Sequence, residues 1–243
     1  MKQFFEKAAM QNHPLRVLDA FLEAEKASEQ AKKYNEMRFV GYVLDIGYDT
    51  ATIITSDPFK IAVGGVPRNS LLIMVPSSLD GLHPHFAILR VLESAQTPLT
   101  KDVQQTYFEL QKKSMPELDI FTQSELQWGA LKTSVLGMFY PHQDKDDSVE
   151  FSGDVNNFVS AHKYRVYSPT QELLHLIVNC LVPSKNQFTI GHLRLTECRL
   201  TTPGKPTPRV NVNVSTIDFK DGRTAMFGKT RQGKSNVVKL IAQ

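Results

Sequence analysis

The residues best suited to chemistry lie late in the sequence, where residues 228–235 read G-x-x-x-x-G-K-S. An apolar run at 224–227 precedes this motif, and a helical pattern of apolar residues at 237–242 follows it. The resulting order of strand, glycine loop and helix is the context that a P-loop requires. Glycines let the backbone curl so that N–H groups face a phosphate chain, and the following helix adds its positive end. The motif predicts nucleotide binding; the alternative is an ordinary strand-to-helix turn.

Each residue type in the motif has a defined role in binding ATP with Mg²⁺. Lys234 would reach the β- and γ-phosphates, and the Ser235 hydroxyl would hold the Mg²⁺ ion. We therefore predict Lys234 and Ser235 as the catalytic residues and Ser235 as the metal ligand. The expected nucleotide-binding residues within the motif are Gly228, Lys229, Thr230, Arg231, Gln232, Gly233, Lys234 and Ser235.

A complete P-loop ATPase needs more than this motif. It also needs an acidic residue on a second strand for Mg²⁺ and water, and usually an arginine finger. The sequence stops at Gln243, about two helical turns after the motif. We therefore expect these residues to be the front part of a larger ATPase, active as an enzyme only in the full-length protein.

Composition restricts the class of protein. The chain has 243 residues with 41% hydrophobic residues, which is enough for one large domain or for one domain plus a fragment. No apolar run approaches the length of a membrane span, and Glu6 interrupts the N-terminal region where a signal peptide would lie. Cys180 and Cys198 are isolated, as in a reduced protein. We predict a cytoplasmic protein without a membrane segment.

The charge is distributed unevenly along the chain. Residues 185–243 contain eleven Lys and Arg residues but only three acidic ones, although the net charge of the whole chain is +3. A basic segment beside a nucleotide loop suits contact with a polyanion such as DNA. The alternative is that part of this charge serves ATP and the rest is solvated surface.

The middle of the chain has the period-two pattern of β-strands. Short apolar runs separated by glycine-containing turns predict an antiparallel barrel or sandwich. The expected strands are 39–44, 50–55, 60–63, 71–75, 86–92, 130–140, 187–200 and 210–214. Ser168, Pro169 and Gln171 predict a helix that starts with Ser168 as its cap. The fold class is therefore mainly β with helical insertions, followed by the first strand, P-loop and helix of an α/β ATPase core.

These patterns divide the chain into four parts. Residues 1–37 form an N-terminal helical arm, and residues 38–200 form the β-domain, with a helical insertion at 98–127. Residues 201–209 form a proline-rich linker, and residues 210–243 begin the ATPase core. In the arm, Leu15, Leu18, Phe21 and Leu22 share one helical face. This face could pack on its own domain or dock on a neighbouring subunit or partner.

Two smaller features leave alternatives open. His83 and His85 flank a proline and could present two imidazoles to a metal, but no third ligand is evident, so a turn with two exposed histidines is the simpler interpretation. Trp128 is the only tryptophan. It suits packing in a core or interface better than stacking on a base.

The segment GKTRQGKSNVVK resembles the Walker A segment of HerA-type ATPases of the HerA/FtsK superfamily, in which an asparagine typically follows GKS; here this residue is Asn236. The approach FTIGHLRLTECRL is also similar to that family. The runs FVGYV, GGVPRNSLLIMVP and FAILRVLE resemble the small β-barrel, of the HAS type, that precedes the motor in these proteins.

The resemblance implies a homo-hexameric ring that translocates double-stranded DNA, with the barrels as a collar that docks an effector. In antiphage defence systems, the context we favour, that effector is a nuclease or a sirtuin-like NADase; in DNA end resection it is a NurA-type nuclease. It adds Asn236 to the nucleotide-binding residues and implies a RecA-like core, whose Walker B acid, arginine finger and sensor residues have no counterpart here. A second possibility is a ring-forming scaffold whose barrel organises an effector.

Overall fold

The computed structural model describes residues 37–77, 81–97, 100–112, 126–141, 149–155, 157–194, 196, 209–220, 222–227 and 233–242. The described residues form two compact units, divided after Pro169. The first unit holds the β-domain. The second holds residues 170–194 and the described residues from Arg209 onward. The N-terminal arm expected at 1–37 lies almost wholly outside the described residues.

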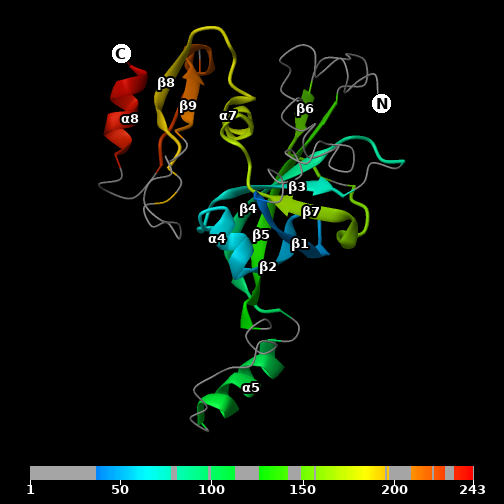
Figure 1. Ribbon diagram of the computed structural model, residues 1–243. Coiled ribbons are helices and arrows are strands. Elements are labelled where there is room, and N and C mark those ends of the chain that lie inside the picture. Colours follow the sequence, from blue (N-terminus) through cyan, green and yellow to red (C-terminus); the bar gives the residue numbers. More distant parts are fainter. Residues whose placement is uncertain are drawn as a thin grey trace. The chain divides into compact units, whose positions relative to one another are not determined.

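The first unit is a closed antiparallel barrel of six strands (Figure 1). Its strands are β1 (Phe39–Ile46), β2 (Thr50–Ser56), β3 (Leu71–Pro76), β4 (Phe86–Ala95), β5 (Trp128–Pro141) and β7 (Tyr164–Tyr167). They are ordered β2-β1-β7-β3-β4-β5, and pairing of β2 with β5 closes the ring. Strand β6 (Val149–Ser152) extends the sheet beyond β5. The expected antiparallel barrel is thus confirmed.

The barrel closes around branched and aliphatic side chains contributed by alternate strand positions. The most deeply buried include Val40, Ile53, Met74, Leu89 and Val166. Two buried threonines satisfy their hydroxyls on backbone carbonyls: Thr55 donates to Val40 at 2.6 Å, and Thr133 donates to Ala51 at 2.8 Å. These bonds let a polar group lie in the interior without an unsatisfied donor.

Three helical segments of the first unit have described bounds, and one of them corrects the sequence analysis. Residues 60–63 are not a strand, because they belong to helix α4 (Asp57–Ala62) and its C-terminal cap. Pro58 stands in the first turn, and Lys60 bonds Asp57 at 2.8 Å, so local chemistry favours a helix over a strand. Helix α5 (Thr100–Lys112) confirms the first half of the expected insertion. The third is the 3₁₀ turn η1 (Ala161–Lys163) before β7.

The second unit contains helix α7 (Gln171–Asn179), the antiparallel pair β8 (Gln187–His192) and β9 (Asn211–Ser215), the 3₁₀ turn η2 (Thr216–Phe219) and helix α8 (Lys234–Ile241). The sequence analysis extended the β-domain to residue 200, whereas β8 pairs with β9 and α7 packs on β9. Helix α7 also begins later than expected. Thr170, not Ser168, accepts the capping bond from the Leu173 N–H at 3.1 Å. The Ser168 N–H instead donates to the Arg38 carbonyl at 2.9 Å, in the barrel.

Candidate nucleotide-binding loop and barrel-end pocket

The C-terminal half of the P-loop motif lies at the start of helix α8. Gly233 is the N-cap residue, with φ 80° and ψ 12°, and Lys234 and Ser235 are the first two helical residues. The motif residues 228–232 lie outside the described residues. Because L-residues rarely adopt this left-handed backbone, glycine is required at 233 by conformation. A Cβ at this position would have no atom within 4 Å, so the space beside the helix start is open.

The start of α8 has the features of an anion site. The carbonyl of Gly233 accepts bonds from the N–H groups of Asn236 and Val237 at 3.0 and 3.2 Å, which begins the helix. The first N–H groups of a helix have no partner within it, and the helix dipole makes this end positive. Ser235 and Asn236 are exposed, and Lys234 is half-buried. The arrangement fits a phosphate with a hydroxyl beside it, which is what ATP with Mg²⁺ would require.

The segment before the loop differs from the expected strand. Residues 223–227 have an irregular backbone, and the Phe227 side chain is 92% exposed. A parallel strand forms only when neighbouring strands supply its hydrogen bonds. The two strands described in this unit, β8 and β9, pair with each other in antiparallel fashion. The strand-loop-helix context predicted from the sequence is therefore only partly present, as loop end and helix.

Asn179 holds the second unit together. Its side-chain amide donates to the carbonyls of His175 and Asn211 at 2.9 Å each, and its oxygen accepts the Asn213 N–H at 2.8 Å. The side chain is 9% exposed. One asparagine thus joins the last turn of α7 to the edge of β9. Sequence reasoning missed this role because only the folded chain brings residues 179 and 211–213 together.

The second unit is basic in the part that the structure describes. It has seven lysine or arginine residues against two acidic residues, Glu172 and Asp218. The basic residues are Lys185, Arg194, Arg209, Lys220, Arg223, Lys234 and Lys239. A net positive unit attracts polyanions such as nucleotides and nucleic acids.

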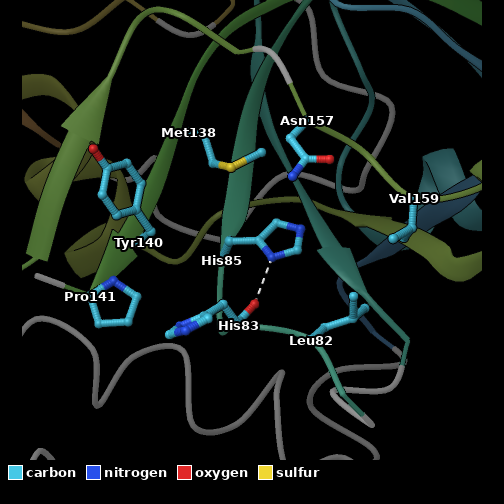
Figure 2. Close-up of a pocket in the computed structure, with 8 residues that line it drawn as sticks. All are labelled: Leu82, His83, His85, Met138, Tyr140, Pro141, Asn157 and Val159. Carbon is cyan, nitrogen blue, oxygen red and sulfur yellow. Dashed lines mark hydrogen bonds between the residues drawn. The ribbon is translucent and has the colours of Figure 1, made fainter. Parts of the chain in front are cut away.

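The barrel unit has a cavity of about 280 Å³ near one end of β4 and β5. Figure 2 shows its lining side chains, with the His85 ring among them. They are Leu82, His83, His85, Met138, Tyr140, Pro141, Asn157 and Val159. Most of these side chains are apolar, and a pocket of this type suits an apolar group with a few polar contacts.

The two histidines in this pocket differ from each other. His83 is exposed, as expected, but His85 is half-buried with both ring nitrogens engaged. Its Nδ1 lies 2.7 Å from the His83 carbonyl, which can only accept, so Nδ1 carries the proton of the neutral ring (Figure 2). Its Nε2 then accepts from the Tyr164 hydroxyl at 3.0 Å. Burial lowers the pKa of His85 and raises that of Tyr164.

These contacts argue against a metal at the paired histidines. Both nitrogens of His85 are used in hydrogen bonds, and a ligand would need one of them free. Among the described residues, no group of three or more His, Cys, Asp or Glu side chains is placed to hold a metal ion. The sequence interpretation of two exposed histidines was right for His83 and wrong for His85.

Comparison with known proteins adds no identification. No protein-family model matches the chain, and no curated protein matches it. Within the described part of the chain, no helix combines the length and apolar character needed to cross a membrane.

Proposed function

We propose that this chain binds ATP at residues 228–236 and is the N-terminal part of a HerA-type, DNA-translocating ATPase. The observation that carries this proposal is the G-x-x-x-x-G-K-S motif with Gly233, Lys234 and Ser235 at the left-handed start of α8. A phosphate placed there would meet the helix N-terminus, the Lys234 ammonium and backbone N–H groups. Ser235 would supply a hydroxyl ligand for Mg²⁺.

Three other features support the motor assignment. A closed antiparallel barrel precedes the loop, as the resemblance to HerA-type proteins implies. The unit that carries the loop is basic, which suits a DNA-contacting motor. In addition, Phe227, Val238 and Leu240 are 92%, 50% and 45% exposed. Apolar side chains of this size beside a P-loop suit the interior of a larger α/β core. The hexamer, the double-stranded DNA and the nuclease or NADase effector follow from the resemblance alone.

The binding step can be tested on this chain directly. Isothermal titration with Mg·ATP should give saturable binding, and Lys234→Ala should weaken it at least tenfold, or about 1.4 kcal/mol. Lys239→Ala is the matched control, because this lysine lies in the last turn of the same helix and is exposed. Equal affinities for wild type and Lys234→Ala would contradict the proposal.

The motor assignment needs the complete protein. Its ATP hydrolysis should rise when double-stranded DNA is added, and Lys234→Ala should abolish turnover while leaving assembly intact. A ring-forming scaffold also predicts intact assembly in Lys234→Ala, but it predicts a different response to DNA, which would not change turnover in the wild type.

A further inference from the structure

Five aromatic side chains form a continuous cluster at the surface of the barrel, which we call the aromatic cluster: Phe39, Tyr42, Phe59, Trp128 and Tyr167. Phe39 is at its centre, with its ring centroid 4.9 Å from those of Tyr42 and Phe59 and 5.6 Å from that of Tyr167. Phe59 continues the cluster to Trp128 at 6.1 Å. All four contacts are edge-to-face, which is a favourable geometry for aromatic pairs.

The aromatic cluster has both buried and exposed members. Tyr167 is 8% exposed and Phe39 is half-buried, whereas Tyr42 is 42% and Trp128 is 40% exposed. Tryptophan and tyrosine held in this way are the residues that contribute most to binding at protein interfaces. A folded barrel gains nothing by leaving them in water, so a covering group is expected.

The chain itself contains a segment that fits this surface. In residues 15–22, Leu15, Leu18, Phe21 and Leu22 follow helical spacing, which gives one apolar stripe. Residues 15–25 carry one basic and three acidic side chains. Beside the cluster, the exposed Arg165 is the register partner of Tyr42 on β7, so the two surfaces are complementary in charge as well as in apolar character.

The connection between the two favours docking within one chain. The described residues begin at Met37, and the cluster begins two positions later at Phe39. Leu22 and Met37 are fifteen positions apart, a stretch that can span up to about 50 Å, more than enough to fold back onto β1. A short tether of this kind gives a local concentration in the millimolar range, which a second chain in dilute solution cannot match.

We propose that residues 15–22 dock, as an amphipathic helix, on the aromatic cluster of their own barrel. Docking would cover Trp128 and Tyr42 with leucine and phenylalanine side chains. This inference is independent of the nucleotide site.

Trp128 is the only tryptophan, so its fluorescence reports on this surface alone. In the full chain, iodide or acrylamide should quench Trp128 weakly. The double variant Leu18→Asp with Phe21→Asp should at least double the quenching constant and shift the emission to the red. Glu23→Ala, on the polar side of the segment, is the matched control and should behave as wild type. Equal quenching in the double variant and the wild type would overturn the proposal.

A second measurement approaches the contact from the barrel side, where the substitution can be checked by circular dichroism for intact β-structure. Docking should protect the Arg16–Val17 bond from trypsin, and Tyr42→Ser with Trp128→Ser should speed this cleavage at least fivefold. Protection that depends on protein concentration, together with dimers in mass photometry, would show docking between chains and would overturn the intramolecular proposal. Equal cleavage rates in variant and wild type would overturn it altogether.

Discussion

The Nε2 atom of His85 lies 3.0 Å from the hydroxyl oxygen of Tyr164, although the two residues are 79 positions apart in the chain. The same hydroxyl oxygen accepts the Val159 N–H at 3.4 Å, and Tyr164 is 1% exposed. The Tyr164 hydroxyl on β7 therefore links the residue just before β4 with the loop before η1. This arrangement needs the neutral form of His85. Only the neutral ring can accept a hydrogen bond from the tyrosine hydroxyl at Nε2 while Nδ1 donates to the His83 carbonyl.

Because burial lowers the pKa of His85 in the folded barrel, acid should destabilise the fold. The direction of this pH dependence follows from the difference in proton binding between the folded and the unfolded chain. Above about pH 6.5, the histidine is neutral in both the folded and the unfolded chain, and its contribution to the free energy of unfolding has its full value. As the pH falls below 6.5, the unfolded chain binds a proton that the folded chain resists, so the free energy of unfolding decreases.

Urea unfolding at pH 7.5 and pH 5.5 would measure this decrease. The His85→Gln variant should show a smaller difference between the two pH values than the wild type, since its side chain does not titrate. His162→Gln is the control, because His162 is exposed on η1. If His85→Gln keeps the full pH dependence, other groups are responsible for it.

A second prediction concerns the close approach of β1 and β2. A Cβ added at Gly41 would lie 2.1 Å from the carbonyl oxygen of Ile54, which is backbone and cannot move aside. Gly41→Ala should therefore cost about 3 kcal/mol or more of stability, through separation of two barrel strands. Gly153→Ala makes the same change where nothing lies within 4 Å, and its midpoint in urea should stay near that of the wild type. Equal midpoints for both variants would contradict the strand packing described here.

Local patterns predicted the elements of the barrel, and long-range contacts explain the errors. Short runs of apolar residues bounded by turn residues located β1, β2, β3, β4 and β5; β2 buries mainly alternate residues, whereas β3 is buried along almost its whole length. The same rule misassigned residues 60–63, where Pro58 and the bond between Lys60 and Asp57 start a helix instead. Closure of β2 on β5 and the bond between His85 and Tyr164 join distant positions, and no local pattern reports them.

In the candidate site too, local sequence patterns indicate some features, and others depend on long-range contacts. The motif in residues 228–235 predicts a phosphate-binding loop, and the structure gives Gly233 a left-handed backbone at the start of α8, which glycine adopts readily. The strand expected at 224–227 depends on neighbouring strands, so periodicity alone could not establish it. The role of Asn179 also depends on tertiary contacts. An asparagine near a helix end reads as a simple cap, whereas here it bonds a strand 32 residues further along.

The Asn179 contacts lead to a third prediction. Asn179→Ala would leave the Asn213 N–H and the Asn211 carbonyl without their partner, at a cost of about 1–3 kcal/mol to the second unit. Hydrogen exchange of the Asn213 amide should accelerate by at least tenfold, while exchange in the barrel strands stays unchanged. Asn211→Ala is the control, because it removes an exposed side chain but leaves the backbone carbonyl that Asn179 binds. Unchanged exchange at Asn213 in Asn179→Ala would mean that this bond contributes little.

The last prediction separates a phosphate-binding role of Gly233 from a purely conformational one. Alanine at this position has open space around its Cβ, but it must adopt φ near 80°, which costs roughly 1–2 kcal/mol. If Gly233 serves only to start α8, Gly233→Ala should lower stability by that amount and have no further effect on ATP. If the loop holds phosphate, the new methyl group and the shifted backbone should also weaken Mg·ATP binding more than tenfold. Gly222→Ala, in the same unit but without a positive φ, should change neither quantity. Titration of both variants with Mg·ATP, at a temperature where each remains folded, would distinguish the two roles. A loss of affinity in Gly233→Ala alone requires a ligand that approaches the backbone at that residue.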